Sequence, residues 1–252
     1  MIDRVAGTSA GAVIAALYAT GRNAEQTDAV VYEEFVRHNP VGDLTFPRYG
    51  LIRGERAATG IRRHLGGKIF EELPRELRVV SVDLLRRRPV VHSRGSVSDA
   101  VSASLRIPGI FPPLRLGDVV HVDGAVLNNV PVSALESTPD GPIIAVNISL
   151  GSGNGSLGTS TAPKRPPRMP GMAETLMRTM FMSSGPATAT ALARADVIIT
   201  PRTGDIGFLE WHQIDVAREA GRLAAAQAIP TILALTSNDP VPVAEERTEA
   251  RQ

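Results

Sequence analysis

The chain has 252 residues, 43% of them hydrophobic and none of them cysteine, so a full hydrophobic core can form without disulfide bonds. Lysine plus arginine number 27 against 26 aspartate plus glutamate, and a net charge of +1 gives no strong field that would favour a nucleic acid partner. Apolar runs stay below the roughly 18 residues of a membrane-spanning helix, and the N-terminus lacks the basic region of a signal peptide, so we expect a cytoplasmic protein.

The first expected element is a short strand that ends near Ala6 and leads into the stretch GTSAG. In this G-x-S-x-G pattern the serine, Ser9, can occupy a strained turn between a strand and a helix, where flanking glycines let the two backbones approach closely. The residues through Leu17 are apolar all round, as in a helix buried against a sheet. The pattern predicts either a nucleophilic serine or a tight turn that enters a core helix. The residues around the serine are Gly7, Thr8, Ala10 and Gly11.

Helical and strand patterns alternate along the rest of the chain, which indicates an α/β fold. Helices are expected at Ala24–Arg37, Glu55–Leu65, Val97–Leu105, Gly171–Ala193 and Gln213–Ile229. Strands are expected at Leu77–Leu84, Pro89–Ser93, Asp118–Val122, Pro142–Ile148 and Asp196–Thr200. Residues 151–168 are rich in glycine, serine and proline and predict a surface loop, and the polar residues 236–252 predict a disordered tail.

A second motif follows the strand expected at Asp118–Val122. Here Asp123, Gly124 and Ala125 precede an Asn-Val-Pro stretch at 129 to 131. An aspartate at the end of a strand is where an α/β fold places functional side chains, although many Asp-Gly pairs are simple turns. The motif therefore predicts either a functional carboxylate or a turn.

Three stretches, taken in order, resemble the signatures of patatin-like phospholipases. They are GTSAGA at 7 to 12, SASLRIPGIFPPL at 102 to 114, and DGA at 123 to 125 with NVP at 129 to 131. The resemblance covers roughly residues 2 to 235 and is strongest to the bacterial branch similar to the catalytic domain of neuropathy target esterase. It implies a three-layer α/β/α fold around a mostly parallel central sheet, with residues 1–235 as one catalytic domain.

The resemblance also implies a serine lipid acyl hydrolase of lipid catabolism, such as a phospholipase, lysophospholipase or esterase. Ser9 is then the nucleophile and Asp123 the sole base, without a histidine, metal or cofactor. An aspartate with the ordinary pKa of about 3.9 is a weak base, so Asp123 would need a desolvated pocket and direct contact with Ser9. The expected partner is a lipid ester, with peripheral membrane contact.

Patatin-like proteins carry a glycine-rich loop ahead of the serine that supplies N–H groups to an oxyanion hole. Eight residues precede Ser9. We therefore expect that the first strand and this loop are missing and that the chain is truncated at its N-terminus. The alternative function is a catalytically impaired scaffold that binds a lipid or a protein partner.

Two histidines offer alternative bases. His121 alternates with Asp123 along one strand and can share its face of the sheet. His212 lies late enough in the chain to complete a conventional Ser-His-Asp triad.

Five of the six methionines lie between residues 169 and 182. Most of them fit one helical stripe, and such a stripe more often faces the core. Because methionine adapts to varied apolar ligands, residues 163 to 182 are alternatively a lid or an interfacial patch that meets an acyl chain or a bilayer.

Overall fold

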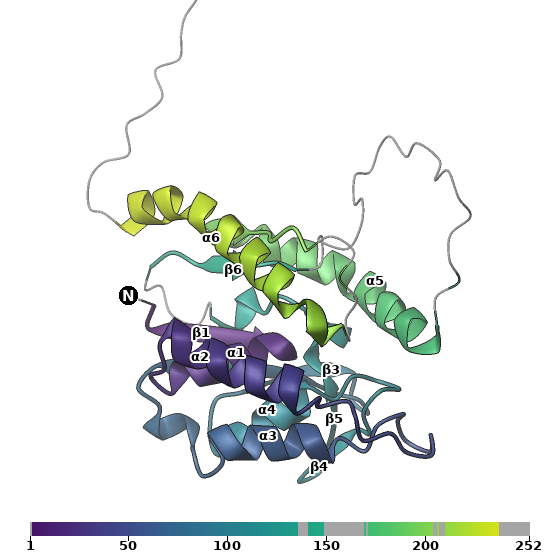
Figure 1. Ribbon diagram of the computed structural model, residues 1–252. Coiled ribbons are helices and arrows are strands. Elements are labelled where there is room, and N and C mark those ends of the chain that lie inside the picture. Colours follow the sequence, from purple (N-terminus) through teal and green to yellow (C-terminus); the bar gives the residue numbers. More distant parts are fainter. Residues whose placement is uncertain are drawn as a thin grey trace, which may run out of the picture.

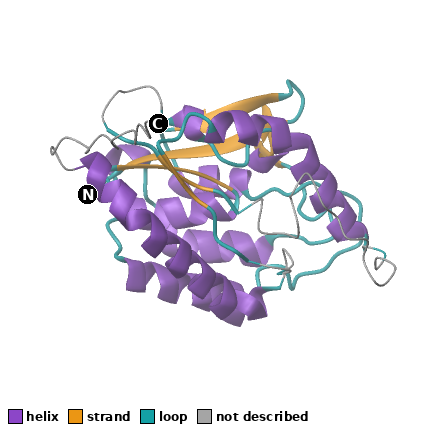
Figure 2. Cartoon of the chain, turned by 90° about the horizontal axis from the view of Figure 1, so that it is seen from above, coloured by secondary structure: helices purple, strands orange, loops and turns teal. Residues whose placement is uncertain are grey.

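The computed structural model describes residues 2–135, 141–148, 169, 171–203, 206 and 210–236. The loop expected at 151–168 lies outside these residues, and so do residues 237–252 of the expected tail. A five-stranded sheet and a two-stranded sheet carry helices on both sides, as the three-layer α/β/α fold requires (Figure 1). Seen from above, the helices lie beside and across the strands (Figure 2).

The elements of the first part of the chain are β1 (Arg4–Thr8), α1 (Ala10–Ala19), α2 (Ala24–Val31), η1 (Tyr32–Arg37), α3 (Glu55–Leu65), η2 (Phe70–Glu72), β2 (Glu76–Asp83), β3 (Arg88–His92) and α4 (Val97–Ser104). The remaining elements are β4 (Leu114–Leu116), β5 (Val119–Asp123), η3 (Gly124–Val126), η4 (Val132–Ala134), β6 (Ile144–Val146), α5 (Met172–Leu192), β7 (Val197–Ile199), η5 (Trp211–Gln213) and α6 (Ile214–Thr236). Element η1 is a π-helix, whereas the other η elements are 3-10 helices.

Most expected elements are confirmed within a few residues. Helix α3 begins and ends where the sequence predicts, and the Ser96 hydroxyl caps α4 by accepting the N–H of Asp99 at 3.2 Å. Helix α6 continues through Pro230 to Thr236, whereas we expected it to end at Ile229. A proline removes one backbone donor and strains one turn, and the alanine and leucine residues around Pro230 favour helix strongly enough to continue.

Strand β2 has partners along both of its edges. It pairs with β3, antiparallel, over residues 79–83. It also pairs with β1, parallel, over 76–80 and with β5, antiparallel, over 81–83, and both ranges overlap the β3 pairing. Because a strand has two edges, β1 and β5 share the edge opposite β3. They run toward each other and end beside Val80 and Ser81, so the residues that follow β1 and β5 are neighbours.

The five-stranded sheet is mixed, which corrects the expectation of a mostly parallel sheet. Only the β1–β2 pairing within it is parallel, while β2–β3, β2–β5 and β4–β5 are antiparallel. Short turns join β2 to β3 and β4 to β5, and such turns connect antiparallel strands only. In the first turn Asp83 accepts the N–H groups of Leu85 and Arg86 at 3.2 and 3.1 Å. The parallel pair β6–β7 forms the second sheet.

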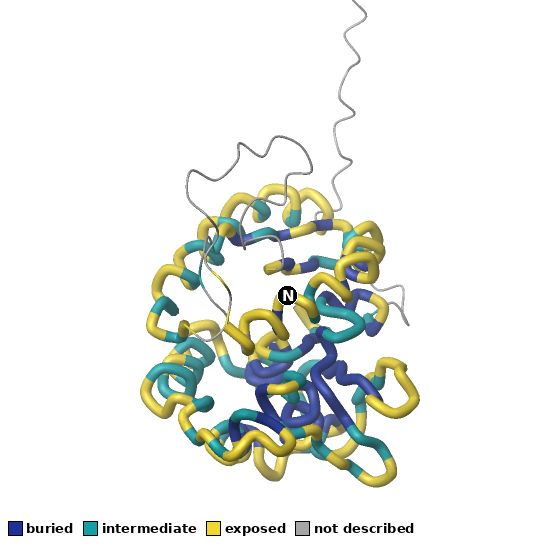
Figure 3. Tube along the Cα trace, turned by 90° about the vertical axis from the view of Figure 1, so that its right-hand side faces the viewer, coloured by how far each residue is buried: buried dark blue, intermediate teal, exposed yellow. Residues whose placement is uncertain are grey.

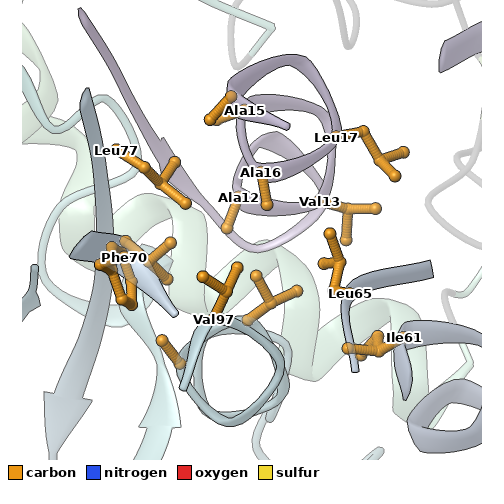
Figure 4. Close-up of a cluster of buried hydrophobic side chains, with 14 residues drawn as sticks. Ala12, Val13, Ala15, Ala16, Leu17, Ile61, Leu65, Phe70, Leu77 and Val97 are labelled. Carbon is orange, nitrogen blue, oxygen red and sulfur yellow. The ribbon is translucent and has the colours of Figure 1, made fainter. Parts of the chain in front are cut away.

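The main core lies between the central strands and helices α1, α3 and α4. The alanines of α1 let it approach β2 and α4 closely, and Leu17, Leu65, Leu77 and Val97 belong to the cluster of buried side chains around α1 (Figure 4). Buried positions concentrate in this part of the molecule (Figure 3). Among the described residues, α6 contributes none that is buried.

Methionines 169–182 do not form a core-facing stripe, which corrects that expectation: of the four in helix α5, one is buried and two are exposed. Met177 is buried, whereas Met169, Met172 and Met182 are exposed. The buried positions of α5 beyond Met177 are Ser184, Thr188 and Ala191. Residues 163–168 and 170 of the expected lid or patch lie outside the described residues. The helices of the described ranges are too short or too polar to span a membrane.

Candidate active site

Ser9 occupies the turn between β1 and α1 in a strained backbone conformation, with φ 55° and ψ −128°. A Cβ on Gly7 would collide with the carbonyl oxygen of Gly11, so the close approach of β1 and α1 requires glycine at position 7. A Cβ on Gly11 would face open space instead. Gly7 is therefore the glycine that the turn needs for packing, whereas Gly11 is not.

Ser104 ties this turn to the body of the sheet. The Ser9 N–H donates to Ser104 Oγ at 2.8 Å, and the Ser104 hydroxyl donates to the Val80 carbonyl at 2.6 Å. Ser104 is fully buried at the end of α4. The sequence marked the stretch at 102 to 114 as a family signature but did not single out this residue. The Ser-x-Ser pattern before Arg106 is the signal that marks it.

Asp123 is fully buried at the end of β5 and faces Ser9. The Ser9 hydroxyl donates to Asp123 Oδ2 at 2.6 Å, and the Ala125 N–H donates to Oδ1 at 2.9 Å. Burial raises the pKa of Asp123 to about 7, against the opposing effect of these two hydrogen bonds. Its own N–H donates to the Arg106 carbonyl at 2.9 Å, which fixes the backbone. The structure thus brings together the two residues that the sequence proposed as a pair.

Gly124 fits the turn after Asp123 against the end of β1. A Cβ on Gly124 would collide with the Val80 carbonyl oxygen and would lie 2.8 Å from Cγ2 of Thr8. The Thr8 hydroxyl in turn donates to the Asn128 carbonyl at 3.2 Å. The DGA motif and the GTSAG motif therefore pack directly on each other.

His121 shares the face of Asp123 on β5, as the alternation predicts, but it hydrogen-bonds elsewhere. Its Nδ1 lies 2.9 Å from Ser81 Oγ, which lies 2.8 Å from Nε2 of His92. Burial lowers the pKa of His121, although the charge of Asp83 opposes this, and burial together with His121 lowers the pKa of His92 to about 4. Both rings are therefore held near Ser81, where burial disfavours their protonated forms.

His212 lies exposed on η5 and not in the turn between β1 and α1 that holds Ser9. The neighbouring Trp211 packs its ring 4.8 Å from that of Phe35 on η1, which fixes η5 to the helical layer. Among the hydrogen bonds of the described residues, neither His212 nor His121 contacts Ser9. The hydroxyl of Ser9 is directed to a carboxylate.

The first turn of α1 leaves backbone donors beside Ser9. Ala10 and Gly11 are exposed, and within the described ranges their N–H groups have no acceptor. The positive end of a helix dipole and its unpaired N–H groups favour negative charge at this position. The site thus combines a hydroxyl, a buried carboxyl group of raised pKa and free amide donors.

Comparison with known proteins shows which family this chain resembles. The family model for patatin-like phospholipases matches residues 1–136, a range that contains Ser9, Ser104 and Asp123. The uncharacterized NTE family proteins Rv2565 of Mycobacterium tuberculosis and Mb2594 of Mycobacterium bovis are each 36% identical over 242 residues, which cover 91% of this chain and 42% of the relative. The mouse patatin-like phospholipase domain-containing protein 6 is 32% identical over 154 residues, 58% of this chain and 11% of that protein. The chain thus spans less than half the length of these relatives.

Proposed function

The chain belongs to the patatin-like phospholipase family, and we propose that it hydrolyses lipid acyl esters with Ser9 as the nucleophile and Asp123 as the base. The observation that carries this proposal is the 2.6 Å hydrogen bond from the Ser9 hydroxyl to a fully buried carboxyl group. The family supports the lipid ester as the substrate class. Residues 1–235 are proposed to form one catalytic domain.

The first step is the attack of Ser9 Oγ on the carbonyl carbon of the ester. The hydroxyl proton passes to Asp123 Oδ2, which already accepts it in a hydrogen bond. A carboxyl group with a pKa of about 7 is a much stronger base than an exposed aspartate and is still largely ionised above neutral pH. Burial of Asp123 therefore adapts it to this role without a histidine.

The second step releases the alcohol and leaves the acyl group on Ser9. Asp123 returns its proton to the leaving alcohol oxygen as the carbon–oxygen bond breaks. Water then attacks the acyl-enzyme, Asp123 accepts a proton from the water, and Ser9 departs with that proton as the free hydroxyl. The products are a fatty acid and an alcohol or lysolipid.

Negative charge that develops on the carbonyl oxygen needs donors that are already in place. The Ala10 N–H at the start of α1 is proposed as one such donor, since it lies next to Ser9 and has no acceptor within the described ranges. The Ser9 N–H is not available, because Ser104 accepts it. Loss of one oxyanion donor typically lowers kcat by about 10²–10³-fold.

The protein is further proposed to act at a lipid surface as a peripheral cytoplasmic protein. The substrate class supports this location, because long-chain acyl esters reside in membranes. Exposed apolar side chains of α5 such as Met172 and Met182 also support contact with lipid.

The test is the turnover of a short-chain nitrophenyl ester by the 252-residue chain. We expect release of nitrophenol by the wild type, its loss in Ser9→Ala, and a covalent adduct of a fluorophosphonate on Ser9 in mass spectrometry. The absence of both turnover and adduct would favour the alternative function, a patatin scaffold that binds a lipid or a protein partner without hydrolysing it.

A further inference from the structure

The loop between η1 and α3 exposes three large apolar side chains within six residues. Phe46 is 86% exposed, Leu44 is 74% exposed and Tyr49 is 65% exposed. Side chains of this size normally lie in a core or an interface, so a cluster of them at one loop tip indicates a surface that binds something apolar. We call residues 44–53 the aromatic loop.

Basic groups accompany the aromatic rings of this loop. The guanidinium of Arg48 lies 5.1 Å from the centre of the Tyr49 ring. Arg48 and Arg53 also line a surface hollow of about 320 Å³ together with Phe46 and Tyr49, and Glu55 is the one acidic residue of its lining. Aromatic rings that carry a polar edge, combined with arginines, are typical of segments at the boundary between bilayer and water.

The base of the aromatic loop is firmly anchored. The N–H groups of Leu51 and Ile52 donate to the carbonyls of Gly109 and Ile110, both at 3.0 Å. Ile52 and Ile110 are buried with Phe111 in a small cluster of their own. The exposed tip therefore projects from a rigid platform, which reduces the entropy that ordering on a surface would cost.

This platform, residues 106–111, also contacts the active site. Its first residue, Arg106, accepts the backbone N–H of Asp123 at 2.9 Å. On its other side, Gly109 leaves space for Leu176 of α5, because a Cβ on Gly109 would lie 2.6 Å from Leu176 Cδ1. The aromatic loop and the exposed start of α5 therefore flank Gly109, and both lie at the right-hand side of the molecule in Figure 1.

We propose that the aromatic loop is a docking surface for an anionic phospholipid bilayer. Phe46, Leu44 and Tyr49 enter the boundary between head groups and acyl chains, and Arg48 and Arg53 pair with lipid phosphates. Docking in this way brings to the lipid surface the loop that bonds to Gly109 and Ile110, a few residues from the Arg106 carbonyl that accepts the Asp123 N–H. The proposal deepens the proposed function, since it names the surface on which a lipid hydrolase would meet its substrate.

The test measures binding without hydrolysis. The full chain carrying Ser9→Ala is sedimented with vesicles of equal parts phosphatidylcholine and phosphatidylglycerol, and with vesicles of phosphatidylcholine alone. Phe46→Ser and Tyr49→Ser should each weaken binding by about tenfold on the mixed vesicles. Arg48→Gln should weaken binding by about fivefold on the mixed vesicles and leave binding to phosphatidylcholine unchanged.

A matched control is Leu233→Ser, at a side chain that is 60% exposed near the far end of α6 (Figure 1). Its binding should equal that of the parent chain. Thermal unfolding of every variant should match that of the parent, because all of the exchanged side chains are exposed. Equal vesicle binding by the parent and the Phe46 and Tyr49 variants would overturn the proposal. A change of oligomeric state in Phe46→Ser at unchanged vesicle binding would also overturn it, in favour of an interface between copies.

A second measurement reports insertion directly. The chain has a single tryptophan, Trp211, so a Trp211→Phe, Phe46→Trp variant carries its only indole at the loop tip. Its emission should shift to the blue on the mixed vesicles and be quenched by brominated acyl chains, whereas unchanged emission would contradict insertion. Ester turnover by the wild type tests the hydrolase separately, so the two proposals can fail independently.

Discussion

Ser9 and Asp123 are 114 residues apart in the sequence and share a hydrogen bond of 2.6 Å. They meet because β1 and β5 run toward each other along one edge of β2 and end beside Val80 and Ser81. The residues at the ends of these two strands are therefore neighbours. Gly7 and Gly124 allow the backbone to pack closely there. The pairing of the two residues is a property of the sheet and not of a flexible loop.

If Ser9 and Asp123 act as one catalytic pair, substitution of either residue should lower the activity as much as substitution of both. Ser9→Ala and Asp123→Asn are each expected to lower kcat/KM for a nitrophenyl ester by about 10³-fold or more, and the double variant should reach the same floor. The reason is that either change alone removes the proton transfer on which the attack depends. Multiplicative losses in the double variant would show that the two residues act separately. His121→Ala should retain most of the turnover, because the imidazole bonds to Ser81 and not to Ser9.

The pH dependence of the reaction should report the raised pKa of Asp123. Below about pH 7 the carboxyl group is protonated and cannot accept the Ser9 proton, so kcat/KM should rise with pH and level off above about pH 8. A rate profile of the wild type from about pH 5 to 9, in buffers of constant ionic strength, measures the midpoint. A profile that is already flat from about pH 5 would assign an ordinary carboxylate to the base.

The buried carboxyl group of Asp123 should make the fold less stable at high pH than at low pH. The unfolded chain ionises Asp123 at its ordinary pKa of 3.8, whereas the folded chain retains the proton until about pH 7. Between these values the folded state binds more protons, so stability falls as pH rises, by up to about 4 kcal/mol in total. Asp123→Asn should therefore unfold at a higher temperature than the wild type above pH 7, with a difference that shrinks toward pH 4. Ser9→Ala keeps the carboxyl group and should keep the fall of stability with rising pH, but the fall should extend to higher pH, because the variant removes a hydrogen bond that lowers the pKa of Asp123.

Ser104 should act through Ser9. Ser104→Ala leaves the Ser9 N–H without its acceptor, which should cost about 1–3 kcal/mol of stability and lower kcat about tenfold with KM little changed. Ser102→Ala removes a buried hydroxyl of the same helix and is the matched control. It should leave kcat unchanged. Equal effects of the two variants on kcat would mean that Ser104 contributes only packing.

The two glycines of the elbow should respond in opposite ways to alanine. Gly7→Ala places a Cβ against the Gly11 carbonyl and should destabilise the fold by several kcal/mol, which chemical denaturation can measure. Gly11→Ala adds a methyl group in open space on a helix and should stabilise the fold by up to about 1 kcal/mol. Destabilisation of similar size in both variants would contradict the asymmetry of the turn.

Local signals predicted much of this fold. The apolar run after Ser9 predicted α1, and the bounds of α3 follow from Glu55 at its start and a glycine pair at its end. The close contact of Ser9 with a desolvated Asp123 was also expected, although only the resemblance to a family linked the two motifs. These features depend on residues that are near in sequence or on a known pattern.

Features set by distant pairing were not predicted. The antiparallel contact of β5 with β2 made the sheet mixed, and the three-residue strand β4 gives too short a pattern to recognise. Ser104 became part of the site because α4 ends beside the elbow. The aromatic loop carries no periodic pattern, so its exposure emerged only from the packing of Leu51 and Ile52 on the platform beneath.

Helix α5 packs on the rest of the molecule through a small number of buried side chains. Among the side chains of α5 that the structure describes, the buried ones are Met177, Ser184, Thr188 and Ala191. This contact removes little apolar surface from water per turn, so we expect the helix to open at a lower free energy than the paired strands of the sheet. Opening at its first turns would withdraw Leu176 from Gly109 while β1, β2 and β5 stay paired. A ligand could therefore reach the surface beside the platform without any loss of the strand pairing that positions Ser9 and Asp123.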